Sequence, residues 1–163
     1  MQILIFTYCL NYEVLNSSSK ITFKLSATLH EVLGNAENIN SEIYYDGDSI
    51  SGYVKVLSKS LKTGNSIRDA QMYKVINSDK YQFIEFIPDS LRDSKIFGKF
   101  RLSGVERYLI VPINLNFSSD LANVSGNFII LLSSFNLKRP KFGFLEVSDT
   151  VNIDFNLVYK CKK

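Results

Sequence analysis

Apolar residues recur at every second position over long stretches of the chain, which is the period of a half-buried β-strand. Residues 20–27, 50–56, 95–104, 108–117 and 150–160 alternate in this way, whereas residues 128–132 are apolar on both faces. Strands of about ten residues span roughly 33 Å. With one apolar face throughout, they predict an antiparallel sheet that is dry on one side and solvated on the other.

Turn-forming residues separate these stretches. They gather in residues 45–49, 60–65, 76–80, 88–94, 102–106, 118–127 and 137–143. The pattern predicts an all-β fold with about eight strands and one helix. Because a closed barrel hides the sheet edges that otherwise invite aggregation, we expect either a barrel or a sandwich.

The one helix is predicted at "NSIRDAQMYK", residues 65–74. Ser66 followed by Asp69 has the spacing of a capping box, in which Ser66 accepts from the Asp69 amide. A rough apolar stripe follows, and Asn77-Ser78 ends it; its members are Ile67, Ala70, Met72, Val75 and Ile76. We expect about three helical turns that plug one end of the barrel, with Asp69 as a cap.

The composition of the chain argues against several classes of function. The 163 residues predict a single domain, and 19 basic against 16 acidic residues leave a net charge of +3, too small and scattered for a nucleic-acid surface. One His and two Cys cannot build a zinc site, and the carboxylates lie singly, so we expect no metal. No nucleophile motif accompanies Asp69 and His30. We therefore expect no catalytic residue, no enzyme and no cofactor.

Residues 1–10, "MQILIFTYCL", are apolar but lack the basic start and cleavage site of a signal peptide. They are also shorter than the about 20 apolar residues that a membrane-spanning helix needs, so we expect no transmembrane helix. Two interpretations stay open: a remnant of an export signal, or the start of the first strand.

Four segments in order resemble the YceI-like family. The landmark is "TGNSIRD" at residues 63–69, which matches the family's T-G-N-x-x-R-D helix start and precedes the strand of "KYQFIEF". Residues 12–46 resemble its opening strands, 98–117 a central strand pair and 135–160 its closing segment. The resemblance covers about residues 11–160, which makes 11–163 one YceI-like domain.

This resemblance implies an extended antiparallel β-barrel of about eight strands, similar to lipocalins, that carries a long isoprenoid or a fatty acid- or amide-type lipid without catalysis. It also favours a periplasmic or exported protein, although a cytoplasmic location stays open, as does a homodimer. The candidate wall residues are Phe23, Leu25, Val54, Val56, Ile84, Phe86, Phe100, Val111, Ile113, Leu115, Phe128, Ile130, Phe155 and Leu157. The alternative is that these residues fill an ordinary core and that the barrel is a protein–protein interaction module.

Four further positions, two charged or titratable and two glycines, each allow a structural or a ligand-related role. Arg68 either reaches a lipid headgroup at the barrel mouth or forms an ion pair that holds the helix. His30 is expected at the surface rather than at a headgroup. Gly52 and Gly98 lie on inward faces, where they either make room for a ligand or mark bends; we favour bends.

The two cysteines, Cys9 and Cys161, lie at opposite ends of the chain. In a closed barrel with an even number of strands, the first and last strands pair antiparallel, which brings the two cysteines towards each other. We hypothesise that a disulfide closes this seam in an oxidising compartment. The alternative is two unpaired thiols.

Overall fold

The computed structural model describes residues 9–139, 141–142 and 145–162. Twelve strands, one α-helix and three short 3-10 turns make up this part of the chain. The elements are β1 Asn11–Val14, η1 Asn16–Ser18, β2 Lys20–Ala27, β3 Glu31–Ala36, β4 Asn40–Tyr45, β5 Ile50–Leu57, η2 Ser58–Ser60, β6 Leu61–Lys62, α1 Ser66–Val75, β7 Phe83–Arg92, β8 Lys95–Leu102, β9 Val105–Ser118, β10 Leu121–Leu131, η3 Leu132–Phe135, β11 Lys141–Phe142 and β12 Leu145–Cys161.

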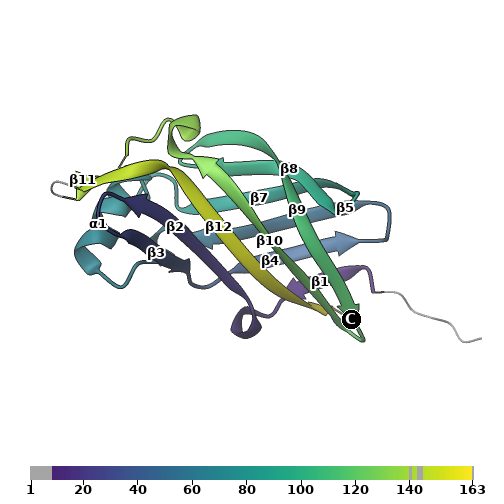
Figure 1. The fold of residues 1–163 in the computed structure, drawn as a ribbon. Coiled ribbons are helices and arrows are strands. Elements are labelled where there is room, and N and C mark those ends of the chain that lie inside the picture. The colour runs from purple at the N-terminus through teal and green to yellow at the C-terminus, as the bar shows by residue number, and fades with distance from the viewer. Residues whose placement is uncertain (1–8, 140, 143–144, 163) are drawn as a thin grey trace, which may run out of the picture.

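Eight antiparallel strands close into a barrel, as expected (Figure 1). The ring runs β1-β4-β5-β7-β8-β9-β10-β12, and β1 closes it by pairing with β12, with Tyr12 opposite Cys161. Strands β2, β3 and β6 extend the sheet beside β12. The fold is therefore the predicted all-β barrel with one helix and a few extra strands.

The long strand β12 gives the barrel two distinct ends. One edge of β12 pairs with β10, from Lys160 opposite Leu121 to Thr150 opposite Leu131. Its other edge pairs with β2 and then with β1. At the end near Val147 lie α1 and the turn between β2 and β3, which we call the helix end (Figure 1). At the other end lie the C-terminus and the hairpin turns after β4 and β9, which we call the seam end.

Two segments predicted as turns are mostly strand. β10 begins at Leu121 inside the predicted turn 118–127, and β7 continues to Arg92 inside 88–94. The polar residues that indicated a turn in fact form hydrogen bonds between neighbouring strands. For example, the Asn123 side-chain amide donates to the Asn156 side-chain oxygen at 2.8 Å. The real turns are two residues long, which the left-handed backbone of Asp93 (φ 53°) and Ser94 (φ 56°) permits.

The helix was predicted correctly in place and length, but its cap was not. Asn65 is the N-cap, and its side-chain oxygen accepts from the Arg68 N–H at 3.0 Å. Ser66 is already helical, and the Asp69 N–H donates to the Asn65 carbonyl. Asn is as good an N-cap as Ser, and here it precedes Ser by one residue.

The predicted stripe of the helix was also partly wrong. Ile67 is 73% exposed and Ala70 is exposed, so neither faces the barrel. The face that turns inward carries Arg68, Met72, Val75 and Ile76. These positions follow the spacing i, i+4, i+7, i+8, which is one side of an α-helix. Arg68 therefore occupies a position that the helical period assigns to the barrel side.

Gly52 and Gly98 mark irregularities in the sheet, as favoured from the sequence. A Cβ at Gly52, whose φ is +120°, would lie 2.1 Å from the Glu42 carbonyl oxygen. Gly98 pairs with Pro88, where the register between β7 and β8 shifts. Neither glycine lines the barrel cavity. They allow close approach of neighbouring backbones rather than room for a ligand.

Candidate ligand-binding cavity

A cavity of about 260 Å³ runs through the barrel interior. Its walls are the inward faces of the strands, where alternate residues point to the same side. Residues of β12 line it from Val147 to Tyr159. Those twelve steps correspond to about 40 Å along the strand, or roughly 30 Å along the axis at the usual strand tilt. The lining of the cavity thus extends along most of the barrel axis.

All of the predicted wall residues lie on this cavity. Those from the N-terminal half are Phe23, Leu25, Val54, Val56, Ile84 and Phe86. Those from the C-terminal half are Phe100, Val111, Ile113, Leu115, Phe128, Ile130, Phe155 and Leu157. Arg68 also borders it. Their contact with a ligand stays a prediction, but the side chains do not fill the barrel between them.

The helix end is closed by apolar packing and fixed by Asp69. Phe100 packs edge-to-face against Phe135 of η3, with ring centres 5.6 Å apart, and Ile76 joins this cluster. The buried Asp69 carboxylate accepts from the N–H of Thr63 at 2.9 Å and from its hydroxyl at 2.6 Å. Asp69 thereby ties α1 to the segment that leads into it, which is a structural role.

Arg68 stands next to Asp69 but does not pair with it. Among the residues that the structure describes, no carboxylate forms an ion pair with Arg68. Its Nε is buried and has no hydrogen-bond partner. The ion-pair alternative from the sequence is therefore wrong within the described chain.

The seam end of the cavity is aromatic, which the sequence did not single out. The ring of Phe117 lies 6.3 Å from that of Tyr12 and 6.3 Å from that of Tyr45, stacked on the latter. All three border the cavity. Burial, and then the nearby Tyr45, raises the pKa of Tyr12. The signal was present, because Phe117 continues the alternation of Ile113 and Leu115.

Deeper in the wall, Tyr159 is one of the few polar groups. It is 4% exposed, and its hydroxyl lies 2.7 Å from the Ser41 hydroxyl. Burial raises the pKa of Tyr159 to about 12, although the hydrogen bond with Ser41 acts in the opposite direction. The phenol is therefore neutral at physiological pH, and the wall around it carries no charge.

A disulfide joins Cys9 to Cys161, with 5.8 Å between their Cα atoms. This confirms the hypothesised bridge at the seam between the first and last strands. The neighbouring ion pair between Lys162 and Glu42, at 3.0 Å, links the C-terminal segment to β4. Of residues 1–10, for which an export-signal remnant and the start of the first strand were both considered, residues 1–8 lie outside the described residues; β1 begins at Asn11.

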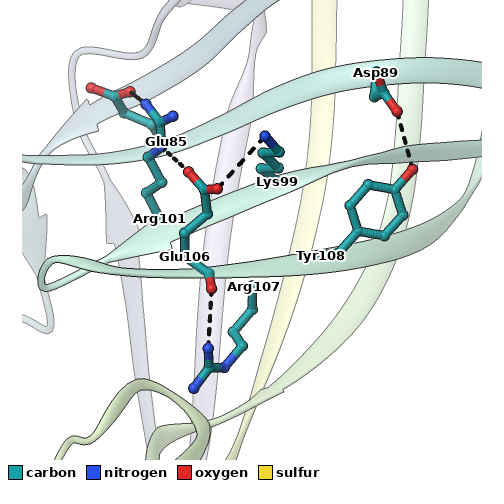
Figure 2. Close-up of polar contacts among 7 residues, drawn as sticks. All are labelled: Glu85, Asp89, Lys99, Arg101, Glu106, Arg107 and Tyr108. Carbon is teal, nitrogen blue, oxygen red and sulfur yellow. Dashed lines mark hydrogen bonds and ion pairs between the residues drawn. The ribbon is translucent and has the colours of Figure 1, made fainter.

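The charged residues on the outer face of β7, β8 and β9 satisfy one another (Figure 2). Arg101 lies between Glu106 and Glu85, and Lys99 approaches Glu106 at 3.7 Å. The hydrogen bond from Arg101 lowers the pKa of Glu106. Since these pairs are exposed, each contributes little to stability. They form a solvated surface of the sheet.

The remaining polar candidates stay at the surface. His30 is exposed in the turn after β2, as expected, and does not border the cavity. Within the described ranges, no three His, Cys, Asp or Glu residues lie close enough to hold a metal ion. The helices of this part of the chain are too short or too polar for any of them to cross a membrane.

Comparison with known proteins identifies the family. The model of the YceI-like domain matches residues 12–159, from β1 into the last strand, β12. The chain belongs to the YceI-like family. The matched range contains the whole barrel ring except for the ends of its first and last strands. A search of curated proteins found no match.

Solved structures agree on the fold. BcnA of Burkholderia cenocepacia superposes with a TM-score of 0.79 at 18% identity, covering 89% of this chain and 98% of BcnA. A polyisoprenoid-binding domain from Saccharophagus degradans, implicated in plant cell wall breakdown, gives 0.76 at 16% identity, covering 94% and 99%. The YceI protein of Campylobacter jejuni gives 0.69 at 19% identity, covering 83% and 88%. Proteins with dissimilar sequences therefore share this fold.

Proposed function

We propose that this YceI-like protein is a non-enzymatic binding protein that holds one long isoprenoid or fatty amphiphile inside the barrel. The observation that carries the proposal is the apolar cavity, which extends from the aromatic seam end to the helix end. The polyisoprenoid-binding domain of Saccharophagus degradans, which has the same fold, supports it. The cavity also weighs against the alternative of a filled interaction module.

The shape of the cavity favours a single extended chain. The residues that line it follow β12 for roughly 30 Å along the barrel axis. Since each C–C bond of about 1.52 Å advances an extended chain by roughly 1.25 Å, the length corresponds to about 24 bonds.

The energetics are sufficient for a carrier. Burying a methylene group contributes about 0.8 kcal/mol before the costs of ordering. At the net yield of roughly 0.3 kcal/mol per heavy atom, a ligand of about 20 atoms gains about 6 kcal/mol and one of about 30 atoms about 9 kcal/mol. These values correspond to dissociation constants from tens of micromolar to below one micromolar.

A charge placed in the wall tests whether the ligand occupies the barrel. The side chain of Ile113 is buried on the cavity wall, whereas its neighbour Asn114 is exposed on the opposite face of β9. We expect Ile113→Asp to lose at least tenfold in affinity for geranylgeraniol, a neutral C20 isoprenol, and to lose stability, because a buried unpaired charge is expensive.

The matched control is Asn114→Asp, which adds the same charge to the same strand and should leave both properties unchanged. Affinity is measured by titration calorimetry on protein whose folding is verified by circular dichroism. A folded Ile113→Asp variant that binds geranylgeraniol as tightly as the wild type would place the ligand outside the barrel.

A further inference from the structure

Arg68 is an exception on the inner face of the helix. The residues that share this face, Met72, Val75 and Ile76, are apolar, and all of them border the cavity together with Arg68. A helix that only plugs a barrel would carry an apolar residue at this position as well. The side chain of Arg68 is half-buried, so its charge is partly withdrawn from water.

The guanidinium of Arg68 also has no ion pair with any residue that the structure describes. Its Nε is buried without a hydrogen-bond partner, the one such side-chain nitrogen or oxygen found in the described ranges. Buried polar groups are normally paired, because an unsatisfied one lowers stability. A cost of this kind at a cavity is characteristic of a group whose partner is a ligand.

The other charges near the cavity are already engaged. The Asp69 carboxylate is occupied by two hydrogen bonds from Thr63. Lys55 packs over the ring of Phe83 at 4.8 Å, and Glu85 lies 3.7 Å from Arg101. Lys55, Arg68 and Glu85 are the charged residues on the cavity border in the described chain, and Glu85 also reaches the outer face through Arg101. Of the three, Arg68 is the one without an ion pair or a cation–π contact there.

The two ends of the cavity therefore differ in chemistry. The seam end presents the rings of Tyr12, Tyr45 and Phe117, which suit hydrocarbon. The helix end presents a guanidinium, whose planar fork of N–H donors matches carboxylate and phosphate oxygens. An amphiphile with an anionic head and one apolar tail has the same polarity along its length.

We infer that Arg68 binds the anionic headgroup, a carboxylate or a phosphate, of a single-chain lipid whose tail runs towards Tyr12, Tyr45 and Phe117. This inference rests on the proposed function, because it requires the tail to occupy the barrel. It assigns the ligand a charge and the bound chain a direction.

Two ligands with the same tail isolate the headgroup. Geranylgeranyl phosphate and geranylgeraniol share a C20 chain and differ in charge. The variants are Arg68→Met, which keeps an unbranched side chain of comparable length, and Arg68→Lys. The matched control is Lys74→Met, which removes an exposed cation from the last turn of the same helix.

For the wild type we expect geranylgeranyl phosphate to bind about 10- to 100-fold more tightly than geranylgeraniol, as a charge-assisted hydrogen bond supplies. Arg68→Met should abolish this ratio, because it weakens the binding of geranylgeranyl phosphate far more than that of geranylgeraniol. Arg68→Lys should retain part of the ratio, and Lys74→Met all of it. Without ligand, Arg68→Met should be at least as thermally stable as the wild type, since it removes an unsatisfied buried group.

Results that differ from these expectations contradict different parts of the inference. An unchanged ratio in Arg68→Met, or a marked loss of stability in that variant, makes Arg68 a structural residue. Inorganic phosphate alone binding as tightly as geranylgeranyl phosphate would indicate a free-anion site. If the wild type binds both lipids equally, the headgroup inference fails and the carrier proposal stands. If it binds neither, both fail.

Discussion

Removal of the disulfide between Cys9 and Cys161 should destabilise the barrel substantially. The bridge joins residues 152 positions apart, so it constrains nearly the whole unfolded chain. It also secures β1, which pairs with β12 and with β4 through only three residues each. Since β1 closes the ring, its detachment would open the barrel between β12 and β4.

The loop length sets the magnitude. In the chain-entropy model, closing a loop of 152 residues removes on the order of 17 cal/mol/K from the unfolded state, or about 5 kcal/mol at 25 °C. Measured values for native disulfides run from about 2 to 5 kcal/mol, because residual structure in the unfolded chain reduces the effect. We therefore expect the double variant Cys9→Ala/Cys161→Ala to lose about 2–5 kcal/mol.

Urea unfolding under non-reducing conditions measures this loss. Cys9→Ala, Cys161→Ala and the double variant should be destabilised about equally, since any of them removes the one bond. Reducing agent should bring the wild type to the same stability and leave the double variant unchanged. Two free thiols in the denatured, non-reduced wild type, or single variants within about 0.5 kcal/mol of it, would refute the reasoning.

Two further predictions concern buried polar groups. The pKa of Tyr159 is raised from 10 to about 12, so the unfolded state releases its proton first and the wild type should lose up to about 3 kcal/mol of stability between about pH 10 and 12. The free energy of unfolding is measured in urea at about pH 9 and pH 11.5, and Tyr159→Phe should lose less of it between the two pH values than the wild type. An equal loss in both proteins would contradict the prediction. Asp69→Ala should lower the free energy of unfolding by about 1–3 kcal/mol because it leaves the Thr63 N–H unsatisfied. The exposed Asp79→Ala is its control, and equal effects of the two would argue against the role of Asp69 in tying α1 to Thr63.

The strands could be predicted where one face is apolar and the other polar. β2 coincides with the predicted residues 20–27, because its alternation reflects a dry and a wet side. The prediction failed in β10, whose polar half resembled a turn. There Asn123 pairs with Asn156 across the sheet, and such a cross-strand partner is not visible in a local pattern.

The wall of the cavity could be predicted for the same reason, since inward positions follow from the alternation. The helix face could not, because hydrophobicity placed Ile67 inside and the period places Arg68 there. The decision between a helix-to-loop ion pair and an unpaired guanidinium at Arg68 depends on which carboxylates the fold brings near the helix. That is a tertiary detail that the local sequence leaves open.

Mass spectrometry of lipids extracted from the purified protein tests the carrier proposal most directly. The protein is expressed in bacteria, purified without detergent and extracted into organic solvent, with Ile113→Asp treated in parallel. We predict a single-chain amphiphile at close to one molecule per wild-type barrel and its depletion in the variant. An extract without such a lipid, together with no thermal stabilisation by geranylgeraniol or geranylgeranyl phosphate, would contradict the account.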